Sequence, residues 1–176
     1  MLKLRELNRK DIAEVNAWRS DRDLINYLGA PFRYINSEVD EKWFESYLSA
    51  RSNTIRCAIY DDSEPEITLG MVALTDIDWV YRIGTLHIMI GNSNNRNRGI
   101  GTFAVTEMLK HGFDDMNLHR IELEVLVSNS RAIHLYEKIG FEKEGIKKKA
   151  AFKNGLYVDV AFMALLSEKW KNIARQ

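Results

Sequence analysis

The segment Asn94–Gly101, NNRNRGIG, places two arginines and two glycines between an apolar run and a helix-like run. The first turn of a helix carries backbone N–H groups without intrahelical partners and a partial positive charge. Gly99 and Gly101 leave this backbone open to an anion, and Arg96 and Arg98 add positive charge. The residue types and spacing therefore predict a loop that binds phosphate, with a solvated loop before a glycine-started helix as the alternative.

Two other phosphate motifs do not fit this segment. A Walker A loop needs Gly-Lys-Ser/Thr, whereas Gly101 is followed directly by Thr102. Residues 99–104, GIGTFA, match the G-x-G-x-x-A form of the dinucleotide fingerprint, and Glu122 follows roughly 20 residues on. However, GNSNNRNR separates these glycines from the preceding strand, and the remaining chain is too short for a second mononucleotide-binding half. The pattern therefore disfavours a nicotinamide or flavin site.

The apolar patterns predict an α/β chain (α+β by stricter usage) with a mixed sheet, in which early strands adjoin and later ones alternate with helices. Strands are predicted over residues 2–7, 54–60, 67–77, 84–90 and 119–127, with a terminal hairpin of 146–152 and 158–166. Helices are predicted over residues 12–18, 38–50, 101–116 and 130–139. The phosphate loop thus lies between a strand and the third helix.

Local signals predict where several of these elements begin and end. Asp11 is expected to cap the first helix, and Ser37 with Asp40 resembles a capping box for the second. Residues 23–36 are expected to be irregular. Gly140 is expected to end the helix 130–139, and Asn154-Gly155 to form the hairpin turn.

Composition predicts one domain and excludes some function classes. The 176 residues are 45% hydrophobic and 28% charged, which indicates a single globular domain, 1–176. A formal net charge of zero disfavours nucleic acid as a partner. Cys57 has no second cysteine to pair with, and neither a signal peptide nor a membrane-length apolar run is visible, so we expect a cytoplasmic protein without a membrane partner. The histidines show no metal-binding spacing, so no metal is expected.

Two segments on either side of the predicted strand 119–127 resemble signatures of the GNAT N-acetyltransferase superfamily. RNRGIG at 96–101 is similar to its R/Q-x-x-G-x-G/A pyrophosphate loop, and NSRAIHLYEKIGFEKEG at 129–145 to its second signature. FKNGLYVDVAFMALL resembles the C-terminal part of ribosomal-protein alanine and spermidine acetyltransferases. The resemblance is close over Ile83–Leu166. It implies one GNAT-type domain, with a mixed, mainly antiparallel central sheet and helices on both faces.

The resemblance also implies an acetyl-CoA site and places residues in it. Backbone groups of Met89, Ile90 and Gly91 correspond to those that bind the pantetheine arm. The residues implied to hold the diphosphate are Arg96, Asn97, Arg98, Gly99, Ile100, Gly101 and Thr102. Asn129 matches a residue that commonly contacts the cofactor, and Tyr136 matches the tyrosine assigned as the acid that protonates the departing thiolate. From helical periodicity alone, Tyr136 would be a core tyrosine.

Acetyl transfer to an amine requires a base, because an alkylamine with a pKa near ~10.4 is almost entirely protonated at pH 7. Glu124 is the first candidate, since LEV matches a carboxylate proposed as base in ribosomal-protein alanine acetyltransferases. Many relatives instead carry a glutamate where this chain has Thr85. His87 and a water relay therefore remain alternatives. Alternation along this strand places Glu122 and Glu124 on one face, where both could simply be solvated. The opposite, apolar face carries Ile121, Leu123, Val125 and Val127.

The acceptor is less constrained by the sequence. The carboxylates that could receive a polyamine or a basic N-terminus, or simply be solvated, are Asp21, Asp23, Asp40, Glu41 and Glu45. The lysines that point instead to an acidic acceptor or the cofactor 3′-phosphate are Lys147, Lys148, Lys149 and Lys153. YLGAPFRY lacks the two glutamates of the WFEEPYE-like stretch in spermidine acetyltransferases, which weakens the polyamine interpretation.

The sequence therefore predicts an acetyl-CoA-dependent N-acetyltransferase in which a primary amine attacks the thioester directly. The amine is expected to belong to a small molecule, such as a polyamine or an amino sugar, or to a protein N-terminus. A homodimer agrees with the habit of the family. A catalytically inactive acyl-CoA-binding regulatory module is the alternative function.

Overall fold

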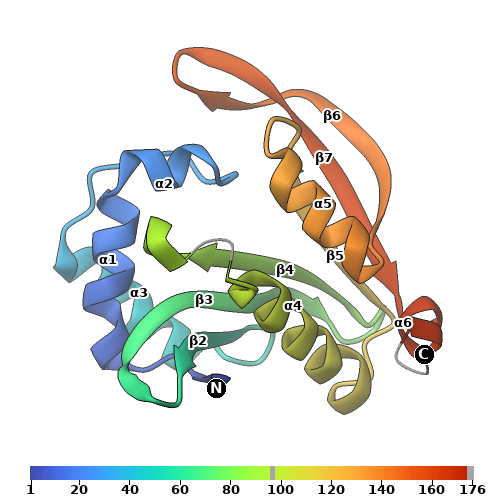
Figure 1. The fold of residues 1–176 in the computed structure, drawn as a ribbon, viewed down its shortest axis with the longest axis horizontal. Coiled ribbons are helices and arrows are strands. Elements are labelled where there is room, and N and C mark those ends of the chain that lie inside the picture. Colours follow the sequence, from blue (N-terminus) through green and yellow to red (C-terminus); the bar gives the residue numbers. More distant parts are fainter. Residues whose placement is uncertain (96–97, 174–176) are drawn as a thin grey trace.

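The computed structural model describes residues 1–95 and 98–173, and within them seven strands form one sheet in the order β1-β2-β3-β4-β5-β7-β6 (Figure 1). The strands are β1 (Leu2–Glu6), β2 (Ile55–Asp61), β3 (Glu64–Asp78), β4 (Ile83–Ile90), β5 (Arg120–Leu126), β6 (Glu142–Lys153) and β7 (Leu156–Leu166). β4 and β5 pair in parallel, whereas the other neighbouring strands pair antiparallel. The predicted mixed, mainly antiparallel sheet is confirmed.

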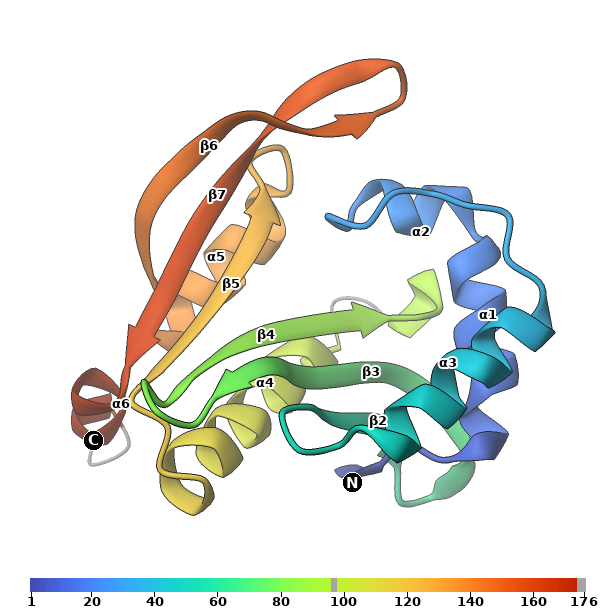
Figure 2. The same cartoon turned by 180° about the vertical axis from the view of Figure 1, so that it is seen from behind.

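Helices cover both faces of this sheet, as expected. The helices are α1 (Ile12–Ser20), α2 (Arg22–Asn26), α3 (Ser37–Ser49), α4 (Ile100–Lys110), α5 (Ser130–Ile139) and α6 (Ser167–Ile173). α4 and α5 pack on one face with the larger apolar core, and α1 and α3 cover the other face with a smaller one (Figures 1 and 2). None of the helices in residues 1–95 and 98–173 has the length and apolar character that a membrane span requires.

The start of α1 differs from the prediction, because Asp11 does not cap it. Asn8 caps a short 3₁₀ turn, Arg9–Asp11, that precedes the helix, and its side chain accepts from the Lys10 amide at 3.1 Å. The carboxylate of Asp11 is buried and accepts hydrogen bonds from the two terminal nitrogens of Arg5 at 2.6 and 2.7 Å. The Asp11 side chain therefore makes no capping hydrogen bond to α1. It joins β1 to the 3₁₀ turn, where it also accepts from the Asn8 amide at 2.9 Å and completes a capping box.

The capping box predicted for α3 is also wrong. Asn36 is the N-cap, and its side chain accepts from the Val39 amide at 3.1 Å. Asp40 is fully buried, where it pairs with Arg19 and accepts a hydrogen bond from Asn16 at 2.7 Å. An acidic residue at this position thus joins α3 to α1, a role that spacing along one helix cannot reveal.

Residues 23–36 are less irregular than expected, since α2 begins at Arg22 with Asp21 as its N-cap. The Asp21 carboxylate accepts from the amides of Asp23 and Leu24 at 2.9 and 3.1 Å. Residues 27–36 are without helix or strand, as predicted. This segment crosses the open end of the sheet (Figure 2).

The C-terminal hairpin and its turn are confirmed, with Asn154 and Gly155 both at positive φ, 49° and 83°. Val127 was expected on the buried face, but it lies beyond the end of β5 and is 39% exposed. α6 was not predicted. Its Trp170 stacks on Phe113 with ring centroids 5.9 Å apart, so this helix completes the α4 side of the core.

Candidate active site

A cavity opens where β4 and β5 separate. The two strands are in register at Ile83–Arg120, Gly84–Ile121 and Thr85–Glu122, and they diverge beyond these pairs (Figures 1 and 2). A cavity of about 690 Å³ lies there, lined by both strands, α1, α5, the hairpin β6–β7 and the segment 27–35. A volume of this size suits a small molecule.

The cavity is reached from both faces of the sheet. Tyr136 of α5 lines it and belongs to the core beneath α4 and α5, together with the β4 residue Leu86. His87 also lines it, and alternation along β4 places its side chain on the opposite face, the one covered by α1 and α3. Two different molecules, one from each face, can therefore meet where β4 and β5 separate.

The strand register directs unpaired backbone groups into this opening. The Gly91 amide donates to the Leu69 carbonyl of β3, whereas the Arg82 carbonyl accepts from the β5 side, so the backbones of even-numbered β4 residues face β5. Ile88 and Ile90 thus point their N–H and C=O groups into the opening. Of the three positions expected to bind the pantetheine arm, Ile90 has this orientation.

The backbones of Met89 and Gly91 face β3 instead. Met89 lines the cavity with its side chain. A Cβ on Gly91 would lie 2.1 Å from the Trp18 ring, so packing against α1 accounts for this glycine.

The predicted phosphate loop ends in an open helix N-terminus. Gly99 is the N-cap of α4 at φ 75°, without a side chain to accept hydrogen bonds, and its carbonyl receives the first helical bond from Phe103. The amides of Ile100, Gly101 and Thr102 consequently have no partner within the helix. Thr102 is exposed, whereas the Ile100 side chain is buried in the core.

An arginine just before Gly99 adds a positive charge near this helix start. Arg98 is exposed, and its guanidinium lies 3.5 Å from the side-chain oxygen of Asn95. Arg96 and Asn97 lie outside the described residues. A helix N-terminus with free amides and a neighbouring arginine fits a diphosphate.

Asn129 caps α5 and also holds the cavity wall. Its side-chain oxygen accepts from the Ala132 amide at 3.1 Å, and its side-chain nitrogen donates to the Tyr27 carbonyl at 3.1 Å. Both ends of the side chain are therefore engaged with the protein itself. Asn129 lines the cavity, and its contact with the cofactor stays a prediction.

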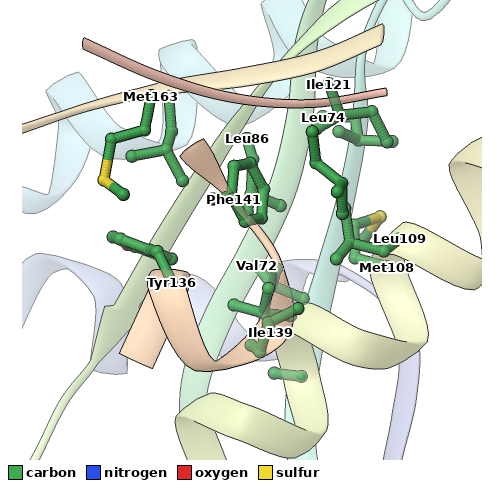
Figure 3. Packing of buried hydrophobic residues seen from close by; sticks show 14 of the residues in the cluster. Val72, Leu74, Leu86, Met108, Leu109, Ile121, Tyr136, Ile139, Phe141 and Met163 are labelled. Atoms are coloured by element: carbon green, nitrogen blue, oxygen red, sulfur yellow. The ribbon is translucent and has the colours of Figure 1, made fainter. Parts of the chain in front are cut away.

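Tyr136 packs at the floor of the opening. Its ring meets Phe141 edge-on at 5.7 Å, in the cluster that also contains Leu86 and Met163 (Figure 3). Burial raises the pKa of Tyr136 to about 12. The phenol therefore stays protonated at neutral pH, as a hydrogen-bond donor must.

His87 is part of a short hydrogen-bond chain. The Thr75 hydroxyl donates to Asp76 at 2.6 Å and lies 2.9 Å from Nε2 of His87. Because this hydroxyl proton points to Asp76, its oxygen can accept from Nε2–H, which leaves Nδ1 as a proton acceptor. Desolvation, with a smaller contribution from Arg56, lowers the pKa of His87, so its neutral form dominates at pH 7.

Glu122 and Glu124 line the cavity as well, but both carboxylates are paired. Glu124 forms an ion pair with Lys147 of β6. Glu122 accepts from Arg120 at 2.9 Å. Because both carboxylates are paired, each is less available than His87 to accept a proton.

Lys153 holds the walls of the cavity together, a role that was not predicted. Lys153, at the end of β6, is buried and donates to the carbonyls of Ile25, at 2.9 Å, and Ala30. Burial lowers the pKa of its ammonium group. It was expected to attract an acidic molecule, but it binds the hairpin to α2 and the following segment. Only its position next to the predicted Asn154-Gly155 turn was visible in the sequence.

Metal and thiol chemistry have no visible site among the described residues. No group of three or more histidine, cysteine or carboxylate side chains in the described ranges is placed to hold a metal ion. Burial raises the pKa of the Cys57 thiol to about 11, so little thiolate exists at neutral pH. A cysteine acyl-enzyme is therefore disfavoured, and direct transfer between two bound molecules suits the cavity better.

Comparison with known proteins agrees with this geometry. A family model described as an acetyltransferase (GNAT) domain matches residues 1–142. A spermidine N(1)-acetyltransferase from Vibrio cholerae is 30% identical over 172 residues, which cover 97% of this chain and 96% of the relative. An L-amino acid N-acetyltransferase from Escherichia coli is 44% identical over 73 residues, or 42% of this chain and 45% of the relative.

A solved structure has the same fold. The crystal structure of the spermidine N-acetyltransferase from Vibrio cholerae in complex with CoA and spermine matches with a TM-score of 0.90 and 29% identity. The match covers 97% of this chain and 98% of that one. Every element from β1 to β7 therefore has a place in a fold that is known to accommodate CoA and an amine.

The bridge made by Lys153 leads to a testable prediction. Lys153→Met should lower the free energy of unfolding by about 2 kcal/mol, because two charge-assisted hydrogen bonds to backbone carbonyls are lost, one of them in a buried environment. It should also lower kcat/KM for the amine while acetyl-CoA affinity changes less than about threefold, since α4 is not involved. Thermal denaturation, steady-state kinetics and calorimetry measure these effects.

Lys148→Met is the matched control, because Lys148 is 77% exposed and pairs with Asp159 on the surface. Exposed pairs contribute little, so this variant should change stability by less than about 0.5 kcal/mol. Equal losses in the two variants would contradict the bridging role of Lys153.

Proposed function

This chain belongs to the GNAT acetyltransferase family, and from this premise we propose that residues 1–176 act as one catalytic domain that acetylates a small-molecule primary amine in the β4–β5 cavity. The chain is an acetyl-CoA-dependent N-acetyltransferase. The main support for this site is the cavity where β4 and β5 separate. Tyr136 lines it from one face of the sheet and His87 from the other.

On the cosubstrate side, the open first turn of α4 would hold the diphosphate through its free amides. Ile88 and Ile90 would bind the arm and the thioester carbonyl with the backbone groups that face the opening. Acetyl-CoA supplies an activated acetyl group when it is bound there. Asn129 supports this side by keeping the start of α5 in place.

On the acceptor side, His87 serves as the base. Its Nδ1 accepts a proton from the amine as the nitrogen attacks the acetyl carbon, and the carbon–sulfur bond then breaks. Its Nε2–H remains on Thr75, which Asp76 orients. His87 is preferred to Glu124 because Glu124 is held by Lys147, and it needs no water relay to reach the cavity.

Tyr136 assists the departing sulfur. Its phenol, with a pKa of about 12, is a weaker acid than a thiol with a pKa near ~8.5. Full proton transfer from the phenol to the free thiolate is therefore uphill, and its main contribution is a hydrogen bond to the sulfur as charge develops. This refines the role of proton donor that the family resemblance implies.

The relatives support a small amine as acceptor without agreeing on its class. One is named for spermidine and another for L-amino acids. Both names describe primary amines of low molecular mass, in keeping with a cavity of about 690 Å³. Spermidine and amino acids are thus the first acceptors to examine.

The transferase proposal predicts release of free thiol from acetyl-CoA only when a suitable amine is present. A panel of polyamines, amino sugars, amino acids and N-terminal peptides should contain at least one such amine. Tyr136→Phe should lower kcat by about tenfold or more with unchanged acetyl-CoA affinity, because the ring packing against Phe141 is kept and the hydroxyl is lost. Thiol detection and calorimetry measure the two effects. Binding of acetyl-CoA without thiol release for any amine would refute the proposed transfer.

The phosphate loop predicts that Gly101→Glu weakens acetyl-CoA binding by more than about tenfold. The new carboxylate would repel the diphosphate at the start of α4, whereas the helix itself tolerates a negative charge in its first turn. Calorimetric titration checks this. Thr106→Glu carries the same charge further along α4 and should keep nearly normal affinity. Unchanged affinity in Gly101→Glu would remove this helix from the cosubstrate site.

The base assignment predicts a pH effect. A histidine with a lowered pKa becomes protonated below its ordinary value near ~6.5, so kcat should fall on the acid side of that pH and be level above it. His87→Gln should lower kcat by about tenfold or more and abolish this acid limb. Glu124→Gln is the comparison variant and should keep it. Loss of the limb in Glu124→Gln alone would make Glu124 the base.

A further inference from the structure

One row of side chains crosses the sheet on the acceptor side of the cavity. Arg56 of β2 is directly opposite Ala73 of β3, and Ala73 is directly opposite His87 of β4. Residues in register on neighbouring strands point to the same face, and two strand spacings separate Arg56 from His87 by roughly 10 Å. Ala73 between them is buried, whereas Arg56 and His87 both line the cavity, so a ligand in the cavity can contact both side chains.

Arg56 is enclosed by aromatic rings and forms no ion pair within residues 1–95 and 98–173, although the more distant charge of Asp76 acts on it. Its guanidinium carbon lies 4.9 Å from the ring centroid of Trp43 and 5.9 Å from that of Tyr47. Its Nε is fully covered and has no hydrogen-bond partner in the described part of the chain. Desolvation also lowers the pKa of this guanidinium, which reflects the cost of enclosing its charge.

Most other charges around the cavity are already neutralised. Arg19 pairs with the buried Asp40. Glu122 pairs with Arg120, and Glu124 with Lys147. The unbalanced charge in the cavity lining is therefore positive.

A second cation adds to this imbalance. Arg33 lines the cavity from the segment after α2, and it forms no ion pair with any residue in 1–95 and 98–173. A polyamine would place its own positive charges beside Arg33 and Arg56, which costs free energy.

The carboxylates that could have received a polyamine are engaged elsewhere or face away. Asp21 caps α2, and Glu45 pairs with Arg9 on the surface. Asp23 and Glu41 are exposed and do not belong to the described cavity lining. The acidic composition of residues 21–45 therefore does not supply a cation site in the cavity.

We propose that the acceptor is a small amine that also carries a carboxylate, as an amino acid does, with the carboxylate bound by Arg56 and the amine beside His87. The planar guanidinium can donate two parallel hydrogen bonds to a carboxylate, and the enclosing rings strengthen them by excluding water. The assignment rests on the proposed acetyl transfer and adds the chemical class of the acceptor.

The test compares amines that differ only by the carboxylate. The matched pairs are methionine and 3-methylthiopropylamine, phenylalanine and phenethylamine, and ornithine and putrescine, with spermidine as a polycation. Thiol release from acetyl-CoA gives kcat/KM for each. The carboxylated member of a pair should be preferred by at least about tenfold, which corresponds to about 1.4 kcal/mol.

Variants of Arg56 identify the group responsible for the preference. Arg56→Gln should reduce kcat/KM for the carboxylated amines by at least about tenfold, and change that for their decarboxylated partners by less than about threefold. Arg56→Lys keeps the charge without the planar fork, so it should lie between the two. Arg9→Gln, a substitution of an exposed arginine outside the cavity, should leave the preference unchanged. Calorimetry with acetyl-CoA verifies that each variant is folded.

The outcomes separate this inference from the function on which it rests. Preference of the unmodified protein for spermidine or the decarboxylated amines would overturn the carboxylate assignment, while their acetylation would uphold the transferase. A carboxylate preference that survives Arg56→Gln would overturn the role of Arg56. Absence of thiol release with every amine would overturn acetyl transfer itself, and the acceptor assignment with it.

Discussion

The separation of β4 from β5 is the constraint from which the site follows. Every other neighbouring pair in the sheet is antiparallel, and this one parallel pair is in register only near its start, at Ile83–Arg120 through Thr85–Glu122, among the described strands. Beyond it, backbone N–H and C=O groups of β4 lie at a strand edge without a strand to pair with. Such groups favour a ligand that contains amides of its own. The arm of acetyl-CoA has this chemistry, which supports the binding site proposed at the end of β4 that is not paired with β5.

A cavity between diverging strands needs walls from elsewhere in the chain. Lys153 and Asn129 supply them by hydrogen bonding to carbonyls at Ile25, Ala30 and Tyr27, more than 100 residues away. Because both contacts converge on the segment after Arg22, that segment is held against β6 and α5 together. Separate ion pairs neutralise most charges near the opening, whereas Arg56 and Arg33 form no ion pair in the described part of the chain, which makes charge the most informative property of the acceptor side.

The elements of the proposed cosubstrate half were predictable because their signals are local. The glycines of the loop and the C-terminal Gly140 each depend on neighbours within a few residues, and they lie as predicted. The cap at Asn129 is equally local but was not predicted. Asp11 and Asp40 were assigned wrongly as caps for the opposite reason. Their partners, Arg5, Thr68, Asn16 and Arg19, are on other elements, and a carboxylate near a helix start satisfies a capping pattern whether or not it is used as one.

The acceptor half depends on relations that sequence spacing does not contain. Arg56, Ala73 and His87 come from three strands and form a row only through the register of β2, β3 and β4. The same is true of the chain from His87 through Thr75 to Asp76. His87 was visible as a possible base, but its rank above Glu124 depends on the pairing of Glu124 with Lys147 across the sheet.

β4 links the proposed cosubstrate and acceptor halves of the site, because alternate residues along it point different groups into the two halves. Even-numbered residues direct backbone groups into the opening, and odd-numbered residues such as His87 direct side chains toward the acceptor. A register shift of one residue would reverse which residues of β4 point backbone groups into the opening, so the site depends on a fixed register. The seven-pair ladder with β3 and the close packing of Gly91 on Trp18 fix this register. Substitutions in the acceptor walls can therefore alter the preferred amine while the proposed cosubstrate half is kept.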